Sequence, residues 1–124
     1  MESFIHLHVH SQYSVLDGQA SINALVDKAM GDGMPGLALT DHGNMFGVKE
    51  MFNYIKKKKG KLKGEVEKLE KQLAEATEAG DTDKIAATEK DIAKVRKKLN
   101  FKPIFGCEMY VANTCLLYTS DAAD

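Results

Sequence analysis

The sequence predicts an α/β fold built from a parallel sheet with helices on its faces. Segments of β-compatible residues alternate with segments of helical periodicity in the order β-α-β-α-β, which is typical of parallel strands joined by right-handed crossovers. Residues 36–40 are almost wholly apolar, as expected of a strand covered on both faces. A charged stretch of helical character, residues 56–100, is inserted between the second helix and the third strand.

The first elements are predicted from apolar spacing and from residues that begin or end helices. We expect a strand over residues 1–10, because apolar residues recur there and a polar segment follows. Its alternation places His6, His8 and His10 on one face. Ser21 predicts the N-cap of a helix that ends at the glycines 31 and 33.

The strand at residues 36–40 is expected to end at the segment Asp41-His42-Gly43. Asn44 is expected to cap the second helix. The inner face of that helix is expected to consist of Met45, Val48, Met51, Phe52 and Ile55. The third strand is expected over residues 103–112, with a bend at Gly106.

The insertion at residues 56–100 is predicted to be an antiparallel helical hairpin. A stripe of apolar residues at spacings of three and four is interrupted at Gly80 and resumes after Thr82, the expected cap of the second helix. Because the stripe is narrow and lysine and glutamate surround it, we expect a solvated arm. A phosphate-contacting patch is the alternative for the lysines at its root, which are Lys56, Lys57, Lys58 and Lys59.

The net charge of −1 averages two unlike regions. Residues 56–100 hold 14 of the 17 basic and 9 of the 18 acidic residues, so they carry +5 and the rest carries −6. The longest apolar run is far shorter than the ~20 residues that span a bilayer. We expect no membrane contact and a cytoplasmic location, and two cysteines alone do not indicate a disulfide framework.

All four histidines lie in the first 42 residues. His8 and His10 at strand spacing project to the same side, so both imidazoles can reach one ion or two adjacent ions. Three more candidate ligands are Asp17 and His42, which follow the first two expected strands, and Glu108, which lies on the third. The mixture of imidazole and carboxylate suits Zn²⁺, Mn²⁺ or Fe²⁺.

Two neighbouring residues are expected to support this site rather than to bind metal. His6 lies deeper in the strand, and Asp41 should face away from its neighbour His42, because adjacent strand residues point to opposite faces. We expect both to orient the ligands or to be satisfied structurally.

These motifs together resemble the opening of the PHP (polymerase and histidinol phosphatase) domain. The resemblance rests on HLHVHS at 6–11, YSVLDG at 13–18, LALTDHGN at 37–44 and KPIFGCEMYVA at 102–112. Within this family, the motifs most resemble the PHP domains that begin the alpha subunits of bacterial replicative DNA polymerases. The resemblance covers about half of the chain, namely residues 3–55 and 101–112.

The resemblance implies a distorted β/α barrel with up to three metal ions at the carboxyl ends of its strands. The matching ligands would be His8, His10, Asp17, His42 and Glu108, and further ligands of the family come from later strands that have no counterpart here. It implies a parent that synthesises DNA with Mg²⁺ and contacts DNA and replisome subunits, and a PHP site that is a phosphoesterase, a proofreading nuclease or a structural platform. We expect the fragment alone to lack the polymerase active site and to be inactive.

Two alternatives remain open. One is a stand-alone PHP phosphatase of the histidinol-phosphatase kind, and the other is a non-catalytic module that binds DNA or a replisome partner. We expect four segments: a first PHP part at 1–55, the hairpin at 56–100, a truncated PHP continuation at 101–113, and a non-native tail at 114–124. The tail resembles the translation of a sequencing adapter.

Overall fold

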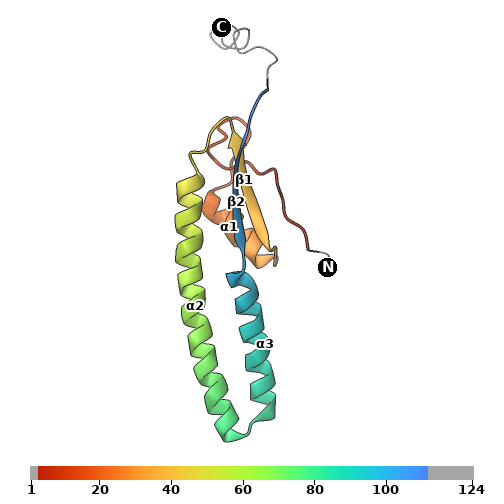
Figure 1. Ribbon diagram of the computed structural model, residues 1–124, viewed down its shortest axis with the longest axis vertical. Helices are drawn as coiled ribbons and strands as arrows, with labels where there is room; N and C mark the ends of the chain where they lie inside the picture. The colour runs from red at the N-terminus through yellow and green to blue at the C-terminus, as the bar shows by residue number, and fades with distance from the viewer. Residues whose placement is uncertain (1–2, 112–124) are drawn as a thin grey trace.

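The computed structural model describes residues 3–111 as a small α/β unit with a long helical hairpin (Figure 1). The elements follow in the order α1 (Ile22–Gly31), β1 (Gly36–His42), α2 (Val48–Ala79), α3 (Thr82–Leu99) and β2 (Lys102–Glu108). Strands β1 and β2 are parallel, with a register that pairs Gly36 with Lys102 and His42 with Glu108. The predicted fold class, including the inserted antiparallel hairpin, is confirmed.

The prediction of a strand at residues 1–10 is wrong for residues 3–10, which form no strand. The segment still runs beside β1, since Ala38 N donates to His6 O at 3.0 Å and Thr40 N donates to Val9 O at 2.9 Å. Three residues of the segment thus span two residues of β1. In addition, Val9 N donates to the side-chain Oγ1 of Thr40 at 2.9 Å. The ladder is interrupted, as at a bulge, and the alternation from His6 onwards is broken.

The helix ends follow local hydrogen bonds, some of which the sequence did not indicate. The Ser21 hydroxyl accepts from Ala24 N at 3.3 Å, which confirms the cap of α1. Helix α2 is instead preceded by Gly47 without a side-chain cap, so the prediction for Asn44 is wrong. Asp81, rather than Thr82, caps α3 by accepting from Lys84 N at 3.2 Å.

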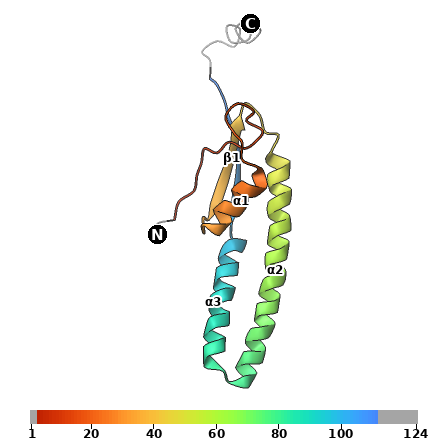
Figure 2. The ribbon, with the colours of Figure 1, turned by 180° about the vertical axis from the view of Figure 1, so that it is seen from behind.

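The hairpin is formed by α2 and α3, which lie side by side and extend away from the sheet (Figures 1 and 2). Helix α2 is continuous for 32 residues and passes residue 56 without a break. It ends at Ala79 and is capped by Gly80, whose φ of 70° is favourable for glycine. The seam between the two helices includes the buried residue Thr88, whose hydroxyl donates to Lys84 O at 2.8 Å. The apolar stripe in the sequence did not indicate Thr88, because its side chain is polar. The division of the chain at residue 56 stays a prediction.

The core lies between the sheet, α1 and the first two turns of α2, with α1 on one face of the sheet (Figure 2). Met51 and Ile55 of α2 are buried, as predicted, but Met45 and Phe52 are each 52% exposed. Met45 precedes the helix, so helical spacing does not apply to it. The described core consists of Ile22, Val26, Ala29, Met30, Leu37, Leu39, Met51, Ile55 and Phe101.

Strand β2 ends at Glu108, so residues 109–111 of the predicted strand lie beyond it, and residue 112 falls outside the described range. The tail predicted at 114–124 also lies outside the described residues. Helices of residues 3–111 are too short or too polar to cross a bilayer.

Candidate metal centre

The carboxyl ends of β1 and β2 bring the predicted ligands to one edge of the sheet. His42 is the last residue of β1, Glu108 is the last residue of β2, and the register makes them partners. The extended N-terminal segment passes the same edge and adds His8 and His10. This is the edge at which parallel α/β sheets place their binding sites.

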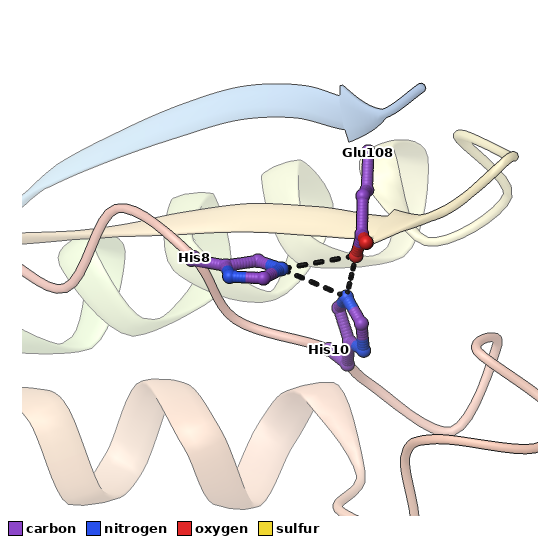
Figure 3. A group of neighbouring side chains, drawn as sticks. All are labelled: His8, His10 and Glu108. Carbon is purple, nitrogen blue, oxygen red and sulfur yellow. Dashed lines mark hydrogen bonds and ion pairs between the residues drawn. The ribbon is translucent and has the colours of Figure 1, made fainter. Parts of the chain in front are cut away.

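His8, His10 and Glu108 point toward one another (Figure 3). The Nε2 atoms of His8 and His10 lie 3.2 Å apart, and His8 Nε2 lies 2.9 Å from Glu108 Oε2. His10 Nε2 contacts the same oxygen. The pKa of the Glu108 carboxyl is held below its ordinary value, mainly by the hydrogen bond with His8 and then by that with His10.

These three residues fit a divalent metal ion. Zn²⁺ binds imidazole at about 2.0–2.1 Å, so two ligands of a tetrahedral ion stand about 3.3 Å apart. The ligand atoms of His8, His10 and Glu108 all lie within 4.8 Å of one another, and the two Nε2 atoms are 3.2 Å apart. The carboxylate supplies negative charge to the same point.

Asp17 and His42 form a second group beside the first. His42 Nδ1 donates to Asp17 Oδ2 at 2.7 Å, and this bond raises the pKa of the His42 imidazole against the opposing effect of desolvation. His10 connects the two groups, because its Nδ1 atom lies 4.0 Å from Asp17 Oδ2 while its Nε2 atom faces Glu108. All five predicted ligands therefore lie at this edge.

Asp41 precedes His42 in β1 and is 1% exposed. Its carboxylate accepts hydrogen bonds from Ser11 N at 2.7 Å, from the Ser11 hydroxyl and from the Ser14 hydroxyl at 2.9 Å. Ser14 Oγ in turn accepts from His42 N at 2.9 Å. Asp41 thus ties the loop that carries Asp17 to the strand end that carries His42.

Sequence reasoning missed Ser11 and Ser14 as supports of the site. The available signal was the spacing of two small hydroxyl residues in a loop that closes tightly at Gly18. A Cβ atom at Gly18 would lie 2.1 Å from Ser11 O, so only glycine fits there. The ring of Tyr110, which was also missed, lies 5.3 Å from that of His42.

His6 and the lysines at the root of the arm lie apart from the ligands. The His6 side chain is exposed, and its ring packs edge-on against Phe4 at 4.7 Å. Lys58 Nζ forms an ion pair with Asp27 Oδ1 of α1 at 2.7 Å. Lys56 and Lys59 line a hollow of about 570 Å³ between α2 and the start of β2. Lys57 is exposed.

The fold and this constellation define a class of protein. Residues 6–122 match the PHP domain, and the chain belongs to the PHP domain family. The resemblance drawn from the motifs is thereby confirmed, and metal binding is a general property of such domains. The matched range includes most of the tail expected at 114–124, whose non-native origin stays a prediction.

Several bacterial relatives are proteins named DNA polymerase III subunit alpha. The chain is 49% identical over 57 residues to the protein of this name from Saccharopolyspora erythraea, and the aligned region covers 46% of this chain and 5% of the relative. It is 64% identical over 46 residues to that of Treponema pallidum, covering 37% of this chain and 4% of the relative. It is 34% identical over 110 residues to that of Chlamydia trachomatis, covering 89% of this chain and 6% of the relative. The chain therefore spans only a small part of these relatives' length.

Proposed function

We propose that this chain is the PHP-domain segment of a bacterial replicative DNA polymerase III alpha subunit, and that its site hydrolyses phosphate esters with bound metal ions. The observation that carries the proposal is the convergence of His8, His10 and Glu108 on one point beside the pair of Asp17 and His42. The names of the relatives support the parent's activity, which is DNA-directed DNA synthesis.

In this proposal, His8, His10 and Glu108 would hold one ion, and Asp17 and His42 would contribute to a second. When bound, such divalent ions would activate a water molecule and stabilise negative charge on a phosphodiester. The residues of the chain keep the imidazoles and carboxylates in place. Asp41 fixes the loop of Asp17 through Ser11 and Ser14, so that the two groups stay side by side.

The donor set favours Zn²⁺, Mn²⁺ or Fe²⁺, since imidazole suits these ions better than Ca²⁺. A complete domain would hold up to three ions, with ligands from strands that follow β2. We place nucleotidyl transfer, and the Mg²⁺ that it uses, outside these 124 residues. On its own, the segment is then proposed to be inactive as a polymerase.

DNA and replisome subunits are the proposed partners of the parent, in the cytoplasm. For the lysines at the root of the arm, a solvated face is favoured over phosphate contacts at Lys58, because Asp27 already neutralises that side chain. A stand-alone phosphatase and a binding module without catalysis remain the alternatives.

Metal titration tests the proposal. The chain is stripped with a chelator and titrated with Zn²⁺ and with Mn²⁺ in a calorimeter. We expect tight binding that is lost in the double variant His8→Ala, His10→Ala. The matched control is His6→Ala, which removes an imidazole from the same segment outside the cluster. Unchanged metal binding in the double variant would refute the ligand assignment.

Hydrolysis assays on the full-length protein that contains this segment separate the alternatives. A metal-dependent release of nucleotides from single-stranded DNA, lost in the double variant, supports the proposed nuclease. Release of phosphate from histidinol phosphate in preference to DNA would favour the phosphatase. DNA binding that is unaffected by the double variant, without hydrolysis, would favour the binding module.

A further inference from the structure

The loop that carries Asp17 is held from two sides, and only one of them involves Asp41. On the other side, the Tyr13 hydroxyl donates to Glu50 Oε2 of α2 at 2.6 Å. Tyr13 lies four residues before Asp17, within the same tight loop that Gly18 closes.

Tyr13 is also fixed along its backbone. Its N–H donates to the Ser11 hydroxyl at 3.2 Å, and its carbonyl oxygen accepts from the Asn44 side chain at 3.0 Å. Asn44 Nδ2 also donates to His42 O at 3.1 Å, so one amide group connects the tyrosine to a proposed ligand. The ring packs against the hydrophobic core. The side chain therefore spans from α2 to the edge of the candidate site.

Glu50 lies in the first turn of α2. The same helix is anchored in the core by the buried side chains of Met51, the next residue, and of Ile55, about one turn further on. The carboxylate is therefore attached to a rigid element, whereas the loop has no regular secondary structure of its own. The strong hydrogen bond with Glu50, followed by its charge, raises the pKa of the Tyr13 hydroxyl, so the donor stays protonated at neutral pH.

We propose that Tyr13 and Glu50 are positioning residues that set where Asp17 lies, and thereby the affinity of the second metal position formed with His42. They act through the loop and touch no ligand of the first position at His8, His10 and Glu108. This inference rests on the proposed metal function. It extends that function by assigning a role to two residues outside the ligand set.

The chain offers a matched control pair. Tyr54 of α2 donates from its hydroxyl to Asp27 of α1 at 2.8 Å, which is the same chemistry between a tyrosine and a carboxylate. That pair links α1 to α2 and does not involve the loop of residues 11–18. Tyr54→Phe therefore removes an equivalent hydrogen bond without releasing Asp17.

The experiment is a titration of the metal-free chain with Co²⁺, followed by absorption and by calorimetry. Wild type is expected to bind two ions with separable affinities. The second position has two ligands from this chain against three at the first, so it should be the weaker. In Tyr13→Phe, which keeps the ring and removes the hydroxyl, this position is expected to lose roughly tenfold in affinity, the lower end of what outer partners of ligands typically contribute. The first position should change by less than about twofold, because the hydrogen bonds of Tyr13 go to Ser11, Glu50 and Asn44 and not to the ligands of that position.

Glu50→Ala should reproduce the effect of Tyr13→Phe, while Glu50→Gln retains an acceptor oxygen and should restore most of the affinity. Tyr54→Phe should leave both affinities unchanged. The inference is overturned if Tyr13→Phe leaves the second affinity intact, or weakens both positions equally. It is also overturned if Tyr13→Phe loses its helical circular dichroism while Tyr54→Phe keeps it, since Tyr13 would then serve the whole fold. Wild type that binds fewer than two ions would instead count against the proposed metal function.

Discussion

The Nε2 atom of His8 lies 2.9 Å from Oε2 of Glu108, although the two residues are 100 positions apart in the sequence. Most of the intervening chain is the hairpin of α2 and α3, which leaves the sheet and returns to it (Figure 1). The arm therefore lies between site residues in the sequence, but none of the five proposed ligands belongs to α2 or α3.

Shortening the hairpin is expected to leave the metal centre intact. Leu73 and Ile92 face each other across the seam, lining one hollow. Replacing residues 74–91 by a short glycine-containing turn should therefore rejoin the two helices in register. Zn²⁺ affinity, measured by calorimetry, should stay within about twofold of the unmodified chain, an estimate based on the separation of the two regions. A loss as large as that of the double histidine variant would show that the arm supports the site.

Replacing Asp41 by asparagine is expected to destabilise the chain. The buried carboxylate accepts several hydrogen bonds from Ser11 and Ser14. In the asparagine variant, the NH₂ group would face one of these donating groups, and that hydrogen bond would be lost. Leaving a buried polar group unsatisfied costs about 1–3 kcal/mol. The free energy of unfolding in urea measures the effect. Asp32→Asn is the control, because its ion pair with Lys28 is exposed and should contribute less than about 0.5 kcal/mol.

The ion pair of Lys58 and Asp27 is expected to make stability depend on pH. The hydrogen bond from Lys58 lowers the pKa of Asp27 below its ordinary value of 3.8. The stabilisation of the folded state by this ion pair is therefore fully present above the ordinary pKa of aspartate. It is lost as the pH falls through the lower pKa that Asp27 has in the folded state. Because both side chains are partly exposed, it should amount to a few tenths of a kcal/mol, about the level of a surface pair.

The measurement compares unfolding of wild type and Lys58→Gln in urea at several pH values. The difference between the two proteins should be constant near pH 6 and should shrink below about pH 4, where free aspartate becomes protonated. An equal difference at pH 3 and at pH 6 would contradict the assignment of this ion pair.

Two glycines are expected to respond to alanine in opposite directions. Gly60 lies inside α2, and a Cβ atom there would meet nothing within 4 Å. Gly60→Ala should therefore raise the free energy of unfolding by about 0.5–1 kcal/mol through helix propensity. Gly18→Ala would place its Cβ 2.1 Å from Ser11 O, so it should lower that free energy by about 1–3 kcal/mol. Thermal unfolding followed by circular dichroism tests both, and a stabilised Gly18→Ala would contradict the described loop.

Local patterns predicted the helices well because their signals are local. Ser21 and Gly80 act within one turn of the helices that they begin and end. The buried run at residues 36–40 indicated a parallel strand, and strand ends collect side chains at one edge of a sheet. The proposed ligands could thus be named from the sequence, whereas their separation into two groups could not.

The errors come from residues whose partners are distant in sequence. Asn44 has the side chain of a helix cap, and its Oδ1 accepts from Phe46 N at 3.2 Å, but its Nδ2 holds it to Tyr13 O, 31 residues away, and α2 begins only at Val48. The first ten residues have the alternation of a strand, but Thr40 Oγ1 takes the hydrogen bond of Val9 N and interrupts the ladder. Neither competition is visible to a pattern that considers neighbours only.

His10 presents one ring nitrogen to each group of the candidate centre. A neutral imidazole has a single lone pair for coordination and keeps its proton on the other nitrogen. Coordination through Nε2 therefore fixes the tautomer with the proton on Nδ1, on the side of Asp17. His10 can then serve only one ion as a ligand, and toward Asp17, whose Oδ2 lies 4.0 Å away, it presents an N–H rather than a bridge between metals.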